Sequence, residues 1–322
     1  MKKIGVYTSG GDAPGMNAAI RAVVRTAHSQ KIEVMGILNG YVGLLENKMI
    51  PLLPRDMGNI VQRGGTILKT GRSQEFHKPE FRAKAAQILK NSHIDGLICI
   101  GGDGSFRGAN ALWTEHRIPV IGVAGTIDND IFGTDDTIGF DTAINTAVEA
   151  IDKIRDTADS HDRIFIVEVM GRNSGFIASA VGLSGGAEEI LTAENIIPVE
   201  KIVDKLKDSR AKGKTSSIII TAEGQKPGRA YDLAEAIRKK SGLDAKVCIL
   251  GHQQRGGSPT AHDRILASRL GAEAVMALIR GSSNIMIGTS GGKLIECSLD
   301  LVMQNEKHGD TSLIQLAKLL SV

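Results

Sequence analysis

The chain has 322 residues, which is enough for two domains of ordinary size. Its 39 Lys and Arg residues nearly balance its 36 Asp and Glu residues, and a net charge of +3 gives no bulk attraction to nucleic acid or to a membrane surface. Three cysteines in or near apolar runs, and no apolar stretch of about 20 residues, predict a cytoplasmic protein with free thiols and no membrane span.

Short apolar runs alternate with segments of helical periodicity along the chain. We expect strands at residues 4–7, 34–38, 97–100, 120–123, 164–169, 218–220 and 247–250, and helices at 16–27, 81–89, 140–154, 199–206, 231–237 and 265–279. This alternation favours the α/β class, because crossover helices join parallel strands. We expect two lobes that exchange segments: residues 1–139 with about 252–305, and residues 140–251 with about 306–322.

Glycines and polar residues gather directly after the predicted strands. The stretches are TSGGDAPGMN, GGDGS, AGTIDND, MGRNSG, AEG and GHQQRGG. Ligands of parallel sheets bind outside the carboxyl ends of the strands. The sequence therefore predicts a binding site along this edge.

Two of these stretches are suited to phosphate. Gly11 lies in the first, and Gly102, Gly104 and Ser105 lie in the second. Glycines let backbone N–H groups approach an anion, and the helix that follows adds its dipole. The alternative is a tight turn with Asp as the helix N-cap. Neither stretch matches the P-loop pattern or the dinucleotide fingerprint.

Three carboxylates in these stretches are candidates for chemistry. Asp103, between glycines, is suited to Mg²⁺, which takes one or two carboxylates plus phosphate oxygens; capping is the alternative. Asp128 and Asp130 lie two residues apart, so that one can accept a proton while the other serves a metal or restrains its partner. The alternative is an exposed Asx-rich turn, and the flanking Ile127 and Ile131 argue against it.

Basic residues on the same edge would balance the charge of a phosphate. They are Arg72, Arg163, Arg172, His252 and Arg255. The Arg fork fits phosphate oxygens, and charge stabilisation is what phosphoryl transfer requires most. Each could instead be a solvated side chain. Arg21 and Arg25 share one helix face, which is either a solvated stripe or a second anion site.

Together, these stretches resemble a known family. TSGGDAPGMN, RGGT, IGGDGS, GTIDND, SHDRIFIVEVMGRNSG and LGHQQRGGSPTAHDRILASRLG resemble the bacterial ATP-dependent 6-phosphofructokinases, in order, over at least residues 3–280. The resemblance implies two Rossmann-like three-layer lobes with mostly parallel sheets, an active site in the cleft between them, and a homotetramer. It also implies a glycolytic kinase that transfers the γ-phosphoryl group of Mg-ATP to the 1-hydroxyl of fructose 6-phosphate.

The resemblance assigns roles by position. Asp128 would be the general base, with Thr126 and Asp130 beside it, and Arg172 and Arg72 would stabilise the transferred group. The ATP contacts would be Gly11, Tyr41, Arg72, Ser73, Gly102, Asp103, Gly104, Ser105 and Gly108, with Asp103 as the Mg²⁺ ligand. The sugar contacts would be Thr126, Ile127, Asp128, Met170, Gly171, Arg172, Glu223, Lys246, His252, Gln253, Gln254 and Arg255, with Arg163 reaching across from a neighbouring subunit.

An effector site for ADP or phosphoenolpyruvate is also implied. Its residues would be Arg21, Arg25, Arg55, Asn59, Arg155, Gly186, Glu188, Lys212 and Lys214. The chain departs from the family at Lys246, where Arg is usual, at Asn59, where Asp is common, and at Thr215, where Lys can occur. We expect these departures to alter sugar affinity and effector response rather than catalysis.

Two related activities and two unrelated functions compete with this interpretation. Pyrophosphate-dependent relatives typically carry Asp at position 104 and Lys at position 125, and glycine at both positions favours ATP. A tagatose 6-phosphate kinase is the other related enzyme. A non-catalytic nucleotide-sensing subunit would not need Asp103, Asp128, Arg72 and Arg172 together. An NAD kinase shares a GGDG loop but has no use for GTIDND.

Overall fold

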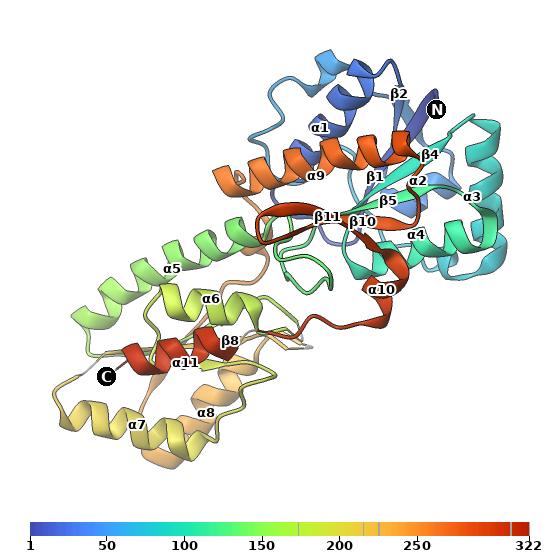
Figure 1. The fold of residues 1–322 in the computed structure, drawn as a ribbon. Coiled ribbons are helices and arrows are strands. Elements are labelled where there is room, and N and C mark those ends of the chain that lie inside the picture. Colours follow the sequence, from blue (N-terminus) through green and yellow to red (C-terminus); the bar gives the residue numbers. More distant parts are fainter. Residues whose placement is uncertain (173, 215, 225, 310, 322) are drawn as a thin grey trace. The chain divides into compact units, whose positions relative to one another are not determined.

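The computed structural model describes residues 1–321 except 173, 215, 225 and 310. The chain forms two compact units (Figure 1). The first contains residues 1–142 and 255–307, and the second contains residues 143–254 and 308–322. The crossings that we predicted near residues 139, 252 and 305 lie within a few residues of these divisions.

A seven-stranded sheet in the order β11-β10-β5-β4-β1-β2-β3 forms the centre of the first unit. Its strands are β1 (Lys3–Ser9), β2 (Glu33–Ile37), β3 (Met49–Pro51), β4 (Gly96–Gly101), β5 (Val120–Ala124), β10 (Ile285–Ser290) and β11 (Lys293–Ser298). Only the edge strands β3 and β11 pair antiparallel. Every residue of β4 and β5 is buried, which explains why both read as continuous apolar runs.

Helices cover both faces of this sheet. They are α1 (Met16–Ser29), α2 (Gly40–Leu45), α3 (Pro79–Asn91), α4 (Asp103–His116), α9 (Ala261–Arg280) and α10 (Leu299–Gln304), with short 3₁₀ helices η1 (Pro54–Met57) and η2 (Glu75–His77). Helices α1 and α9 pack against each other, and α3 packs against α2 and α4 (Figure 1). A core that includes Leu89, Leu97, Phe106 and Met286 joins α3, β4, α4 and β10.

The second unit has a smaller sheet in the order β7-β8-β6-β9, and all of its strands are parallel. The strands are β6 (Ile164–Val169), β7 (Glu189–Leu191), β8 (Ser217–Ala222) and β9 (Ala245–Ile249). The helices are α5 (Phe140–Ser160), α6 (Phe176–Ser184), α7 (Val199–Ala211), α8 (Arg229–Ser241) and α11 (Thr311–Leu320), with η3 (Gly251–Arg255) after β9. Helix α7 packs on α8, and α6 packs on α11. The predicted class, α/β with mostly parallel sheets, is confirmed.

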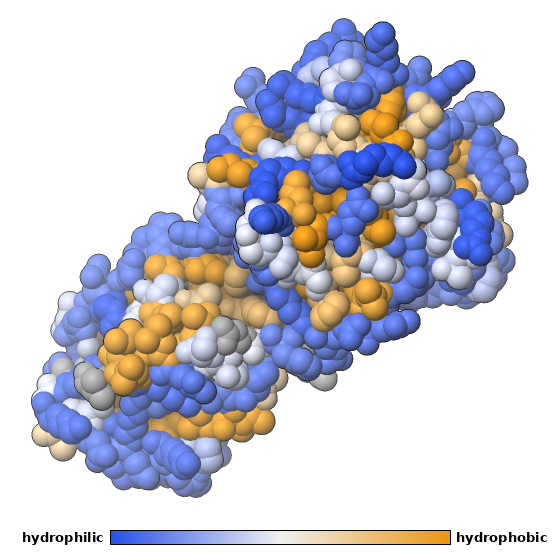
Figure 2. Space-filling model, viewed as in Figure 1, coloured by the Kyte–Doolittle hydropathy of each residue, from blue (hydrophilic) through white to orange (hydrophobic). Residues whose placement is uncertain are grey.

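Two properties of the helices concern contacts outside the chain: exposed apolar surface and the ability to cross a membrane. Figure 2 shows hydrophobic surface over α11, where Leu319 is 70% exposed and Leu320 is 66% exposed. Exposed apolar surface of this kind is typical of contact faces. Among the described residues, no helix combines the length and the apolar character that crossing a bilayer requires.

Candidate active site

Three glycine-rich loops of the first unit lie side by side because three parallel strands are neighbours. Ser9, at the end of β1, pairs with Gly101 at the end of β4, and Gly101 pairs with Ala124 at the end of β5. The Gly125 N–H donates a hydrogen bond of 2.9 Å to the Gly101 carbonyl. The predicted phosphate loops and the GTIDND loop therefore leave the same edge of one sheet.

The loop after β1 is contacted by the guanidinium group of Arg255, which we had expected at the sugar site. Arg255 donates from Nη1 to the Asp12 carbonyl at 3.1 Å. A Cβ at position 11 would lie 2.6 Å from this nitrogen, so Gly11 permits the close approach. We predicted Arg255 as a sugar contact, but its side chain lies against the predicted ATP loop. Thr70 donates to the Gly10 carbonyl at 2.8 Å, which brings the segment of Arg72 and Ser73 to this loop.

The loop after β4 leads directly into α4. Gly102 is the N-cap, and Asp103 is the first helical residue, so the capping role that we weighed for Asp103 does not apply. The Asp103 side chain is 47% exposed and accepts a hydrogen bond of 2.9 Å from Arg107. A Cβ at position 104 would meet no heavy atom within 4 Å. The start of α4 thus combines an accessible carboxylate at Asp103 with open space at position 104, which suits an anion with its cation.

A buried aromatic cluster supports this loop from behind. Tyr41 in α2 is 5% exposed and donates from its hydroxyl to the Ser105 carbonyl at 2.6 Å. The Tyr41 hydroxyl accepts from the Tyr7 hydroxyl at 2.9 Å, and its ring stacks on Phe76 with 4.0 Å between centroids. Burial, reinforced by Cys99, raises the pKa of Tyr41, which keeps the hydroxyl a donor. A Cβ at position 108 would lie 2.7 Å from the Tyr41 ring, which explains Gly108.

The loop after β5 gives its two carboxylates different environments. Asp128 is 5% exposed, and its N–H donates to Thr126 Oγ1 at 3.2 Å, whereas Asp130 is exposed. The exposed turn that we weighed as an alternative is therefore wrong for Asp128. Asn129 between them has a φ of 51°, and its Nδ2 donates to the Asp135 carbonyl at 3.1 Å. Two neighbouring carboxylates in different environments can take different roles, one of them as the proton acceptor.

In the second unit, most of the predicted sugar residues follow the carboxyl ends of the strands. Met170, Gly171 and Arg172 follow β6, Glu223 follows β8, and His252 and Gln253 follow β9. Gln254 is fully buried, and its Oε1 accepts from the Met170 N–H at 2.8 Å. The amide of Gln254 therefore supports the Met170 backbone from inside the unit.

Two predicted sugar residues lie at the other end of this sheet. Arg163 immediately precedes β6, and Lys246 pairs in register with Phe165 near the start of β6. Five residue steps of a strand, about 17 Å, separate the level of Lys246 from Met170, and seven steps, about 23 Å, separate Arg163 from Met170. Arg163 therefore does not share an edge with Arg172, contrary to our expectation. The Lys246 ammonium pairs with Asp244 at 2.7 Å.

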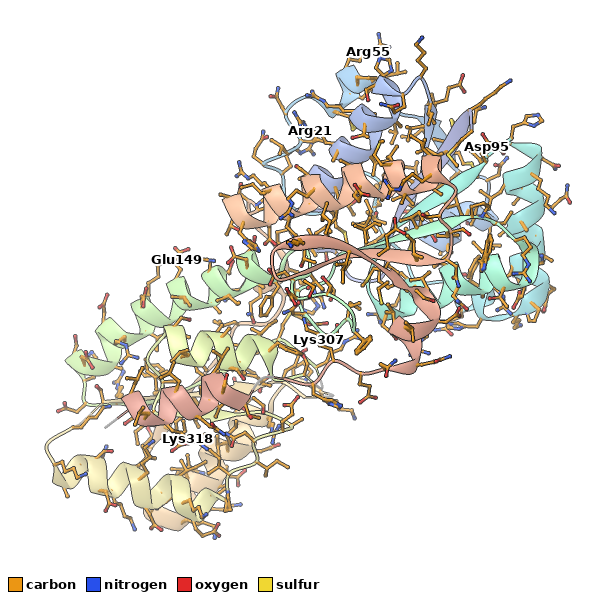
Figure 3. All side chains as sticks on the ribbon, viewed as in Figure 1. Arg21, Arg55, Asp95, Glu149, Lys307 and Lys318 are labelled. Atoms are coloured by element: carbon orange, nitrogen blue, oxygen red, sulfur yellow. The ribbon has the colours of Figure 1, made fainter. Side chains whose placement is uncertain are left out.

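The predicted effector residues of the first unit lie on α1 and η1, which pack together. Figure 3 shows Arg21 on α1 and Arg55 on η1. Arg25 is exposed one turn after Arg21, and Asn59 lies just beyond η1 with a φ of 55°. These side chains give one surface of the unit a positive charge.

The remaining effector residues belong to the second unit. Glu188 is 4% exposed and pairs with Lys214 at 2.7 Å. Arg155 donates to the Gly186 carbonyl at 3.0 Å. Lys212 is exposed at the end of α7, and Thr215 lies outside the described residues. The predicted set is thus divided between the two units.

The family model for phosphofructokinase matches residues 3–278. The chain belongs to the phosphofructokinase family. An ATP-dependent 6-phosphofructokinase 1 from Thermus thermophilus is 56% identical over 322 residues, with 100% of both chains covered. The phosphofructokinase structure from Saccharomyces cerevisiae is 40% identical with a TM-score of 0.86, and the match covers 94% of this chain and 45% of the yeast chain. The chain thus spans less than half of the yeast protein. A pyrophosphate-dependent phosphofructokinase from Marinobacter aquaeolei is 25% identical with a TM-score of 0.85, and covers 97% of this chain and 86% of its own.

Positions 104 and 125, which we expected to bear on the phosphoryl donor, have different surroundings. A Cβ at position 125 would lie 3.1 Å from Ile100 Cγ2 and 3.3 Å from the Met16 methyl group, so a side chain there needs room that this chain does not provide. Position 104 has open space. Gly104 therefore leaves space free beside Asp103, whereas Gly125 is favoured by the close packing of Ile100 and Met16.

Proposed function

We propose that the chain is an ATP-dependent 6-phosphofructokinase, a phosphotransferase that carries the γ-phosphoryl group of ATP to the 1-hydroxyl of fructose 6-phosphate. The observation that carries this proposal is the juxtaposition of two loops. The Asp103 loop, suited to Mg²⁺ and phosphates, is hydrogen-bonded through Gly101 to Gly125 of the Asp128 loop, at 2.9 Å. Donor and base therefore meet at one sheet edge. The 56% identical relative from Thermus thermophilus carries the same activity in its name.

The first unit would bind ATP. The amides of Gly11 and of Gly102 to Gly104, with the Ser105 side chain, would approach the phosphates, and Arg72 and Arg255 would supply counter-charge. Tyr41 and Gly108 would bound the adenine side. Mg²⁺ held at Asp103 would neutralise the charge that the phosphates accumulate.

Asp128 would take the proton of the sugar hydroxyl. Its carboxylate is buried, and Thr126 fixes the backbone that carries it. The neighbouring Asp130 would restrain the Asp128 carboxylate as it accepts the proton. Arg172 would stabilise the group in transfer, because an oriented cation is worth most where charge develops.

The second unit would bind the sugar phosphate. Its contacts in that unit would be Met170, Gly171, Glu223, His252 and Gln253. Arg163 and Lys246 lie at the opposite end of that sheet, which supports a role toward the site of a neighbouring subunit. The hydrophobic surface over α11 likewise supports a homo-oligomer, and we propose the homotetramer of the family.

Replacing Lys246 by Arg is expected to lower KM for fructose 6-phosphate with little change in kcat. A guanidinium can give a phosphate two parallel hydrogen bonds where an ammonium acts as a point charge. Steady-state kinetics at saturating ATP would measure both constants, with Lys239→Arg on the exposed face of α8 as the control. An unchanged KM in the Lys246 variant would remove this residue from the phosphate site.

Replacing Arg25 by Ala is expected to abolish the response to ADP or phosphoenolpyruvate and to leave catalysis intact. An effector changes activity only by preferring one state, with a coupling of about 1 to 3 kcal/mol. The assay uses sub-saturating fructose 6-phosphate with and without each effector. Arg238→Ala, at the exposed end of α8, is the control. If the Arg25 variant responds as the wild type does, the effector binds elsewhere.

The proposed substrate is tested by comparing sugars. Purified protein with ATP and MgCl₂ should release ADP with fructose 6-phosphate and much more slowly with tagatose 6-phosphate. If the protein preferred tagatose 6-phosphate, that sugar would be the substrate instead of fructose 6-phosphate. ADP release with neither sugar would support the nucleotide-sensing subunit instead.

A further inference from the structure

A residue close to the C-terminus is bonded to the loop that carries Asp128. Lys307 donates from Nζ to the Asp135 carbonyl at 2.8 Å, across 172 positions of sequence. Figure 3 shows Lys307 in the segment that follows α10, next to the loop between β5 and α5. Residue 307 lies outside the span that the family model matches, residues 3–278. None of the motifs quoted above contains it.

The Asp135 carbonyl has a second donor within the loop itself. Asn129 Nδ2 donates to the same oxygen at 3.1 Å. Asn129 stands between Asp128 and Asp130, with the left-handed φ of 51° that Asn tolerates better than most residues. The carbonyl therefore connects the Lys307 ammonium to the backbone of the two carboxylates. A change in its direction would be transmitted to Asn129.

Burial and the neighbouring carboxylates act in opposite directions on the charge of Lys307, and burial has the larger effect. Burial lowers the pKa of Lys307 to about 8, whereas the nearby Asp136, Asp135 and Asp130 act to raise it. The side chain is half-buried among acidic groups, where a charge-assisted hydrogen bond is roughly twice as strong as a neutral one. The bond to Asp135 is thus charge-assisted while Lys307 is protonated, which is the predominant state below about pH 8.

Other contacts hold the far end of the loop without Lys307. The Asp135 N–H donates to the Thr289 carbonyl of β10 at 2.8 Å, and Asp135 Oδ2 accepts from the Gly291 N–H at 2.7 Å. Thr137 Oγ1 donates to the Thr126 carbonyl at 2.6 Å. Loss of the Lys307 bond should therefore leave the loop folded but let the Asp135 carbonyl and Asn129 shift.

We infer that Lys307 is a positioning residue for phosphoryl transfer: its bond to the Asp135 carbonyl, which Asn129 shares, holds Asp128 at the place where it meets the sugar hydroxyl. The inference rests on the proposed role of Asp128 as the base. Lys307 is the last residue of the first unit, and the second unit resumes at residue 308. The segment that leaves the first unit would therefore help to position the base. A displacement of this segment would act on the base through the Asp135 carbonyl.

The kinetic test uses two substitutions at Lys307 and a control. Lys307→Met keeps the length of the side chain and removes the donor, and it should lower kcat roughly tenfold, the worth of one charge-assisted hydrogen bond. KM for ATP should stay within about twofold, because no ATP contact changes. Lys307→Arg should restore most of kcat. Lys84→Met, on the exposed face of α3, should match the wild type. A kcat of Lys307→Met within about twofold of wild type would overturn the inference.

A second measurement does not depend on activity. Amide hydrogen exchange of residues 126–137, followed by mass spectrometry, should be roughly tenfold faster in Lys307→Met than in the wild type or Lys84→Met. Thermal unfolding should change little, because β10 still anchors Asp135. Unchanged exchange in this loop would overturn the inference by itself. If the wild type showed no kinase activity, the proposed function would fail, and the exchange result would still decide whether Lys307 holds the loop.

Discussion

Replacing Asp128 by Ser is expected to lower kcat by a factor of about 10² to 10⁴ or more while both KM values change little. A positioned base contributes rate enhancement of this order, because the proton must leave the hydroxyl as the phosphoryl group arrives. Serine is smaller than aspartate, so it fits at this buried position and the fold should persist. Steady-state kinetics with both substrates would measure the loss.

The control for this substitution is Asp152→Ser on the exposed face of α5, which should behave as wild type. Thermal unfolding of both variants would show that the loss is not due to unfolding. Turnover of Asp128→Ser within a few-fold of wild type would remove Asp128 from the role of base.

Replacing Gly104 by Asp is expected to abolish most of the use of ATP. The new carboxylate would project into the open space beside Asp103, where the phosphates should lie. Two like charges about 4 Å apart repel by about 4 kcal/mol near a protein surface. That repulsion should lower kcat/KM for ATP by roughly 100-fold or more. The measurement is kcat/KM for ATP at saturating fructose 6-phosphate.

Gly104→Ala separates the charge from the added volume. No heavy atom lies within 4 Å of a Cβ at this position, so the alanine variant should keep most of the activity. The Asp variant should also remain folded, because an acidic residue in the first turn of α4 is favourable to the helix dipole. If Gly104→Asp used ATP nearly as well as the wild type, the phosphates would not lie at the start of α4.

The fully buried strands β4 and β5 could be predicted from the sequence, and β10 and β11 could not. The apolar runs 97–100 and 120–123 become β4 and β5, whose residues are all buried. The predictions missed β10 and β11, because Gly288 interrupts β10 and β11 alternates between exposed and half-buried residues. A Cβ at position 288 would lie 2.8 Å from Thr134, so a tertiary contact selects this glycine. Helix α4 was missed because Gly104 and Gly108 resemble loop residues.

The predicted site residues were those that directly follow strands, since topology alone brings them to one edge. Residues that support the site from distant positions in the sequence were not predicted. Tyr7 and Phe76 hold Tyr41 through a hydroxyl and a ring face, and nothing in their local sequence indicates this. The position of Arg163 was wrongly predicted for a related reason. Arg163 lies before a strand, so it lies at the opposite end of the sheet from the residues that follow strands. Lys307 meets Asp135 only through the tertiary fold of the first unit, across 172 positions of sequence.

The most direct test of the account is a comparison of phosphoryl donors with a single sugar. Purified wild-type protein, MgCl₂ and fructose 6-phosphate would be incubated with ATP or with pyrophosphate, and the product followed by ³¹P nuclear magnetic resonance. The account predicts a new phosphate monoester at the 1-position with ATP, accompanied by ADP, and none with pyrophosphate. Product from pyrophosphate and none from ATP would contradict it.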